Sequence, residues 1–251
     1  MNRFKYVSLL WKHNTLMSLK AHKNLSSKLA KPFSTRENNE SILNNKCNVA
    51  NFNDTERNKQ VKCHRCHSDI SVDVVPFNCQ SCTALITIDV FKIFNFFELF
   101  DIREVNYDID KNYLRKKFND IQKIYHPDRN SQNQEIEKIN EVSSYLNHAY
   151  RVLSNDVDRA IYLMNILYDY KIAEEENLED DQFLFEIVQI NEEINNPDAN
   201  IASLTKEYKE KYEDYVGKIK LYFKEKDFNS IVSSLKKLKF INKVLERLQN
   251  L

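Results

Sequence analysis

Apolar residues recur every three or four positions over residues 110–153, which is the spacing of amphipathic helices. The pattern predicts two helices joined by a polar loop at 129–133, and Asp110 stands where an N-cap belongs. The apolar stripe of the first helix is Leu114, Phe118, Ile121 and Tyr125, and that of the second is Ile136, Ile139, Ser143, Leu146, Tyr150 and Leu153. We therefore expect an αα-hairpin.

Three more helical stripes follow an acidic connector at 169–180. They cover residues 183–194, 201–226 and 231–248, and Pro197 lies just past the end of the first. Three helices can bury such stripes against one another, so we expect a three-helix bundle over 181–251.

His126, Pro127 and Asp128 stand where the first helix of the hairpin should end. Proline lacks an N–H and pushes the preceding residue out of the α region, so His126 and Asp128 should lie at an exposed tip. The basic residues on or near this surface are Arg115, Lys116, Lys123 and Arg129. The arrangement suits docking to a charged partner, although a helix stop and solvated charges are the simpler interpretation.

Four cysteines form two C-x-x-C pairs with twelve residues between them: Cys63, Cys66, Cys79 and Cys82. This spacing is typical of a tetrahedral thiolate site, for which zinc is the usual metal. We expect a zinc-binding module over 61–90, with a short β-hairpin bringing the pairs together. His64 and His67 are near enough to replace a ligand, and disulfides or a redox or iron site are the alternatives.

Composition favours helices and narrows the function. The 251 residues are 42% hydrophobic, enough for a core, but include only one glycine and four prolines. One glycine cannot build a P-loop or a dinucleotide-binding fingerprint. Of 37 basic residues, eight lie in residues 1–36, so the remainder carries 29 basic and 37 acidic residues, a net charge of −8. An acidic body argues against nucleic acid as a partner.

The first 36 residues are basic, free of Asp and Glu, and amphipathic near their start. These features predict a mitochondrial transit peptide at 1–36, with a disordered basic tail or a plastid address as alternatives. Residues 37–60 are polar and aperiodic and are expected to be a linker. No apolar run reaches the roughly 18 residues of a membrane span, so no membrane partner is expected.

The tripeptide in this helical context resembles a J domain, the module that activates DnaK-type ATPase chaperones. Further resemblance lies in Phe96–Phe100, in Leu153–Leu163 with Asp156 where proline is usual, in Phe183–Glu186 and in Asn191–Glu193. Together these segments resemble the HscB-type co-chaperones of iron–sulfur cluster biogenesis, over roughly residues 60–250. Some members, the animal and plant mitochondrial ones, carry a similar four-cysteine element.

The resemblance implies an all-α, L-shaped co-chaperone of the mitochondrial matrix, with a J domain at 91–168. It would stimulate a DnaK-type chaperone and deliver the iron–sulfur scaffold protein to it. The implied chaperone-binding residues are His126, Pro127, Asp128, Arg115, Lys116, Lys123 and Arg129. The implied scaffold-binding residues are Leu184, Phe185, Val188, Gln189, Glu192 and Phe240, among which Phe185 and Phe240 lie off the main apolar stripes. Gln189 and Asn191 are neutral where the family usually has charges.

Other functions fit parts of the sequence. A J protein could recruit a different client through its zinc module and bundle. Paired C-x-x-C thiols could serve an oxidoreductase, and a zinc ribbon could bind nucleic acid, although the acidic body opposes that. Catalysis at His126 and Asp128 is not expected, because no serine, cysteine or threonine nucleophile adjoins them and glycines for an oxyanion hole are missing.

Overall fold

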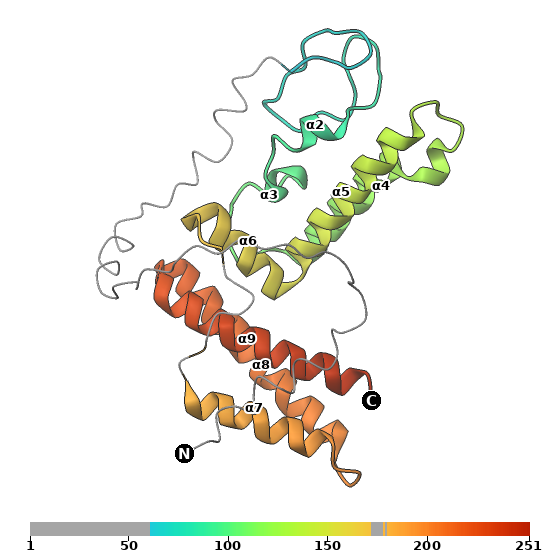
Figure 1. Cartoon of the computed structure of the whole chain (residues 1–251). Coiled ribbons are helices and arrows are strands. Elements are labelled where there is room, and N and C mark those ends of the chain that lie inside the picture. The colour runs from blue at the N-terminus through green and yellow to red at the C-terminus, as the bar shows by residue number, and fades with distance from the viewer. Residues whose placement is uncertain (1–60, 172–177, 179) are drawn as a thin grey trace, which may run out of the picture. The chain divides into compact units, whose positions relative to one another are not determined.

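The computed structural model describes residues 61–171, 178 and 180–251 (Figure 1). The predicted transit peptide at 1–36, the linker at 37–60 and most of the acidic connector lie outside these residues. The helices are α2 (Ile88–Phe91), α3 (Phe96–Leu99), α4 (Lys111–Tyr125), the 3₁₀ helix η2 (Pro127–Asn130), α5 (Ile136–Ser154), α6 (Asp156–Tyr168), α7 (Asp181–Ile194), α8 (Ile201–Glu225) and α9 (Phe228–Gln249). The described residues contain no β-strand, which confirms the expected helical fold class.

Helices α4 and α5 form the expected αα-hairpin, and they lie side by side in Figure 1. The Asp110 carboxylate caps α4 by accepting hydrogen bonds from the N–H groups of Asn112 and Tyr113, at 2.8 and 3.1 Å. Between the helices the rings of Phe118 and Tyr150 stack, with centroids 4.2 Å apart. The predicted apolar stripes, from Leu114 to Tyr125 and from Ile136 to Leu153, therefore lie within these two helices.

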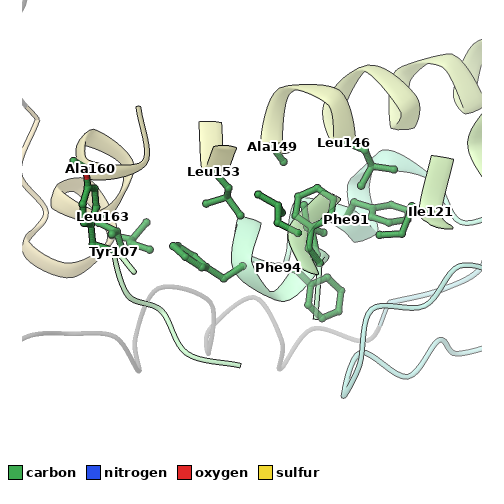
Figure 2. Close-up of a cluster of buried hydrophobic side chains, with 14 of the residues drawn as sticks. Phe91, Phe94, Tyr107, Ile121, Leu146, Ala149, Leu153, Ala160 and Leu163 are labelled. Atoms are coloured by element: carbon green, nitrogen blue, oxygen red, sulfur yellow. The ribbon is translucent and has the colours of Figure 1, made fainter. Parts of the chain in front are cut away.

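One buried core joins the hairpin to its surroundings. Figure 2 shows Phe91 beside Ile121 and Leu146, and Leu153 farther along α5. The same core extends into the C-terminal helices through Ile219, Ile231, Leu235 and Leu238. A second cluster joins α7 to α8 and α9, and consists of Phe183, Ile190, Ile194, Leu204, Tyr208, Ile241, Val244, Leu245 and Leu248. The three C-terminal helices thus bury their stripes against one another, as expected.

Helix α6 is the one long element whose start the sequence pattern did not place. It begins at Asp156, after Asn155 caps it by accepting from the N–H groups of Val157 and Asp158, at 2.9 and 3.0 Å. Asp156 lies in the first turn of α6, where a carboxylate interacts favourably with the helix dipole. It also forms ion pairs with Lys111 and Arg159, at 2.9 and 2.6 Å.

Arg159 is the buried charge that holds this region together. Its Nε donates to the carbonyl of Tyr107 at 2.8 Å, and an Nη donates to the carbonyl of Leu153 at 2.7 Å. The guanidinium also lies over the Tyr107 ring, 4.6 Å from its centroid. One side chain therefore satisfies two buried carbonyls and the Asp156 carboxylate.

None of the helices in the described residues combines the length and the apolar composition needed to cross a membrane.

Replacing Arg159 tests this buried network. Arg159→Leu should lower the free energy of unfolding by about 3 kcal/mol, because buried carbonyls lose their donors. Urea unfolding followed by circular dichroism measures the change. Arg151→Leu, at an exposed position of α5, is the control and should stay within about 0.5 kcal/mol of the wild type. Equal unfolding midpoints for the two variants would show that the network contributes nothing.

Candidate functional site

The tip, defined as His126, Pro127 and Asp128, lies between α4 and α5. His126 ends α4 in an extended conformation, with φ −68° and ψ 130°, and Pro127 begins η2. The N–H of Asp128 donates to Nδ1 of His126 at 3.2 Å, so the neutral imidazole carries its proton on Nε2. The side chains of His126 and Asp128 are 49% and 90% exposed. An imidazole and a carboxylate are thus presented to solvent by a turn of fixed shape.

Two side chains after the tip hold it against the end of α4. The Asn130 amide donates to the carbonyls of Ile124 and His126, at 2.9 and 3.0 Å. The Arg129 guanidinium donates to the carbonyl of Lys123 at 3.1 Å. These bonds satisfy carbonyls that a helix C-terminus leaves without partners. Arg129 was predicted to face a partner, but it also caps α4, and the role of Asn130 was missed, although asparagine is a common turn residue.

The predicted basic residues of α4, which are Arg115, Lys116 and Lys123, are all exposed. Lys123 forms an ion pair with Asp120 at 2.7 Å. Lys117, which sequence reasoning did not single out, pairs with Asp101 at 2.7 Å, and its ammonium lies 5.3 Å from the centroid of the Tyr113 ring. The exposed side of α4 therefore carries a mixture of free and paired charge.

The four cysteines converge. One ligand atom from each lies within 4.8 Å of the others, with Cys63 and Cys82 sulfurs 3.6 Å apart and Cys66 and Cys79 sulfurs 3.7 Å apart. None of the four forms a disulfide. The Ser68 hydroxyl, 3.3 Å from the Cys66 sulfur, lowers the pKa of Cys66 to about 6, whereas burial and the neighbouring sulfurs raise the pKa of Cys82 to about 12. The cluster can hold a metal ion.

Each cysteine pair sits in a turn of its own. The first knuckle, residues 62–69, is closed by a β-bridge between its end residues, and the second knuckle, residues 78–85, is closed by a bridge between Asn78 and Leu85. The β structure of the module consists of these isolated bridges alone, so the expected hairpin between the pairs is not formed. Pro76 has no N–H to donate to a strand pairing there, and Val74 is exposed instead of packed.

The histidines beside the cysteines are not among the converging ligand atoms. Nε2 of His64 lies 2.7 Å from Oε1 of Glu135, at the start of α5. His67 has a positive φ of 60°, and so takes a left-handed backbone position within the first knuckle. His64 therefore contacts the helical hairpin, and Cys63, Cys66, Cys79 and Cys82 remain the donor set.

Helix α7 presents an apolar face to solvent. Phe185 is 61% exposed and Val188 is 39% exposed, with Gln189 and Glu192 exposed beside them. Positions 185, 188, 189 and 192 share one helix face. Leu184 is half-buried. An exposed phenylalanine beside an exposed valine, rimmed by polar residues, is typical of a protein-binding surface.

Two predicted positions near this face differ from expectation. Phe240 of α9 lies off its stripe but is half-buried, because its ring packs edge-on against Phe183 of α7 at 6.3 Å. Asn191 donates to the carbonyl of Ile187 and accepts from Arg247 of α9, both at 2.7 Å. The neutral Asn191 therefore fastens α7 to α9.

Comparison with known proteins gives matches to both halves of the described chain. The DnaJ domain family matches residues 98–162, and the HSCB C-terminal oligomerisation domain matches residues 179–249. The human iron–sulfur cluster co-chaperone protein HscB is 28% identical over 178 residues, which are 69% of this chain and 74% of that protein.

Two further comparisons agree with these matches. The mitochondrial J-type co-chaperone JAC1 of Saccharomyces cerevisiae is 28% identical over 139 residues, 53% of this chain and 72% of the yeast protein. The crystal structure of human co-chaperone HscB superposes with a TM-score of 0.68 at 24% identity, covering 76% of this chain and 98% of that one. The structural likeness supports the fold.

Proposed function

Because the chain belongs to the HscB-type J-domain co-chaperones of iron–sulfur cluster assembly, we propose that it activates a DnaK-type ATPase chaperone and delivers the cluster scaffold protein to it. The chemical step is ATP hydrolysis by the chaperone. This chain contributes binding surfaces and no catalytic group of its own.

The observation that carries the proposal is the exposed tip at the end of a well-packed hairpin. His126 and Asp128 are open to solvent while the turn between them is fixed by Pro127 and by the capping bonds of Asn130. A turn fixed before binding loses little conformational freedom on docking. The exposed Arg115, Lys116 and Lys123 of α4 would add attraction to an acidic patch of the chaperone.

The exposed face of α7 supports delivery of the scaffold. Phe185 and Val188 would form its apolar centre, and Gln189 and Glu192 its polar rim. Aromatic residues at the centre of an interface commonly carry most of the binding energy. A chain that binds both chaperone and scaffold raises the effective concentration of one near the other. Leu184 and Phe240, both half-buried, would pack behind this exposed face and support it.

We propose zinc for the four-cysteine cluster. A tetrahedral ZnS4 site with Zn–S bonds of about 2.3 Å places its sulfurs about 3.8 Å apart. The sulfurs of Cys63 and Cys82 are 3.6 Å apart and those of Cys66 and Cys79 are 3.7 Å apart, and both distances fit this requirement. Four protein ligands fill the coordination sphere of zinc, so the ion would be structural.

The mitochondrial matrix is the proposed location. The first 36 residues have the composition of a transit peptide, and the yeast relative is named as mitochondrial. A reducing compartment would also keep the four thiols available for metal.

The second candidate is a J protein that recruits a different client. The observation that favours it is the surface of the four-cysteine module, on which the apolar Val74 is 75% exposed. In that case the chain would still activate the chaperone, but any binding of the scaffold protein would not depend on the α7 face.

Changing His126 tests chaperone activation. His126→Gln should reduce stimulation of a mitochondrial DnaK-type chaperone to its basal ATP turnover, because losing a central contact costs about 2 kcal/mol, or about 30-fold in affinity. Gln132→Ala, at an exposed position of the same loop, should stimulate like the wild type. Circular dichroism should show equal helix content for all three proteins. A His126→Gln variant that stimulates normally would rule out the proposed docking role of the tip.

Truncating Phe185 tests scaffold delivery. Phe185→Ala should weaken scaffold binding by about 2 kcal/mol, measured by isothermal titration calorimetry, without changing stimulation in the absence of scaffold. Leu221→Ala removes another exposed apolar side chain, 49% exposed on α8, and should leave the affinity unchanged. Scaffold binding that is the same in both variants would favour the different-client alternative.

Metal analysis tests the zinc assignment. The purified chain should contain one zinc ion, and Cys66→Ser should lower zinc affinity by more than about 100-fold, since even second-shell changes cost 10- to 100-fold. Cys47→Ser, at a cysteine that belongs to neither C-x-x-C pair of the sequence, should retain the ion. A chain that binds no zinc, with thiols that titrate freely or pair as disulfides, would contradict the zinc assignment and favour the disulfide or redox alternatives.

A further inference from the structure

The two knuckles of the metal module contact opposite ends of the same loop. We define the tip loop as residues 126–135, from His126 at the end of α4 to Glu135 at the start of α5. The two residues that flank the second knuckle contact the residue just before this loop, and the first knuckle contacts its last residue. The module therefore spans the base of the loop that carries His126, Pro127 and Asp128.

Tyr125 makes the contact before the loop. Its ring is fully buried and meets Phe91 edge-on, with centroids 5.5 Å apart. Its hydroxyl lies 2.9 Å from the carbonyl oxygen of Phe77 and accepts a hydrogen bond from the N–H of Ile86 at 3.1 Å. Phe77 and Ile86 flank the second knuckle directly, so the last residue of α4 is held by the residues on both sides of that knuckle.

Glu135 makes the contact after the loop. One carboxylate oxygen lies 2.7 Å from Nε2 of His64, and the other lies 3.6 Å from the Arg65 guanidinium. His64 and Arg65 are the two residues between the cysteines of the first knuckle. Glu135 also receives a bond from Lys138 at 3.0 Å and begins α5 as its N-cap residue. The first knuckle is thereby tied to the start of the second helix of the hairpin.

The two knuckles are joined to each other at the sulfurs. Each is closed by its own backbone hydrogen bonds, among them Cys63 N–H to Ser68 and Cys79 N–H to Ala84, both 2.9 Å. The residues between the knuckles form no strand. A metal ion bound by all four thiolates would be the link that fixes one knuckle relative to the other.

From this geometry we infer that the metal module is a clamp on the tip loop, with Tyr125 and Glu135 as positioning residues for chaperone docking. Metal binding would fix both knuckles, and through Tyr125 and Glu135 the two ends of the loop. The inference rests on the proposed function, because it assigns the module a role in presenting His126 and Asp128 to the chaperone. It gives the zinc site a purpose beyond stabilising its own fold.

Amide hydrogen exchange of the tip loop in the zinc-loaded full chain tests the clamp. Arg129 and Asn133 are suitable reporters, since their N–H groups bond within the loop to His126 and Asn130, at 3.1 and 2.8 Å. Glu135→Ala should speed exchange at these amides by about tenfold, the effect of losing one charged hydrogen bond. Glu137→Ala also removes a first-turn carboxylate of α5 and should exchange like the wild type. Both variants should keep one zinc per chain.

A second variant tests the other contact. Tyr125→Phe keeps the buried ring but removes the hydroxyl, and it should also speed exchange at the reporter amides while zinc is retained. In zinc-free protein the wild type should exchange faster, and Glu135→Ala should add nothing further, since the contact works only through a fixed knuckle. Exchange unchanged in both variants, or an equal effect of Glu135→Ala with and without zinc, would overturn the clamp.

ATP turnover separates this inference from the proposed function. If the wild type fails to stimulate the chaperone, the proposed function fails whatever the exchange rates are. If the wild type stimulates and the clamp exists, Glu135→Ala should raise the concentration needed for half-maximal stimulation by several-fold and leave the maximal turnover unchanged. Stimulation by Glu135→Ala that matches Glu137→Ala at every concentration would show that the clamp does not serve docking.

Discussion

The packing of α4 against α5 is the interaction on which the rest of the structure depends. Leu114, Ile121 and Leu146 are fully or almost fully buried between the helices and their surroundings. This packing fixes the position in space of the end of α4, where Pro127 stops the helix. It thereby also fixes where His126 and Asp128 reach solvent. The core it belongs to continues into α8 and α9, which in turn carry α7 and its exposed Phe185. The tip therefore depends on the first buried cluster and the α7 face on the second, and α8 and α9 contribute residues to both.

Arg159 shows how the join between the hairpin and its neighbours is made specific. Apolar packing alone allows one helix to shift along another, whereas a buried guanidinium must keep each of its hydrogen-bond partners. Arg159 bonds to Tyr107, Leu153 and Asp156, and the Tyr107 ring stacks on Phe223 of α8 at 5.3 Å. A polar network and an aromatic stack thus fix the register between segments that are far apart in the sequence.

Local features of the sequence predicted most of the fold. Periodic apolar residues, the Asp110 cap and Pro127 marked α4, and C-x-x-C spacing marked the cysteine cluster. Phe185 lies off the apolar stripe of α7 and is exposed, but Phe240, equally off its stripe, is half-buried because α7 places Phe183 against it. The contact of His64 with Glu135 joins residues 71 apart in the sequence. Neither contact could be predicted from spacing, because each is set by how separate elements pack.

We propose that the chain is an adaptor whose tip activates a chaperone and whose α7 face brings that chaperone its client. The most direct test is ATP turnover by the mitochondrial DnaK-type chaperone with the wild-type chain, measured with and without the iron–sulfur scaffold protein. The account predicts stimulation by the chain alone and a further rise when scaffold is added. Stimulation that does not change with scaffold would contradict delivery, and no stimulation in either condition would contradict the account as a whole.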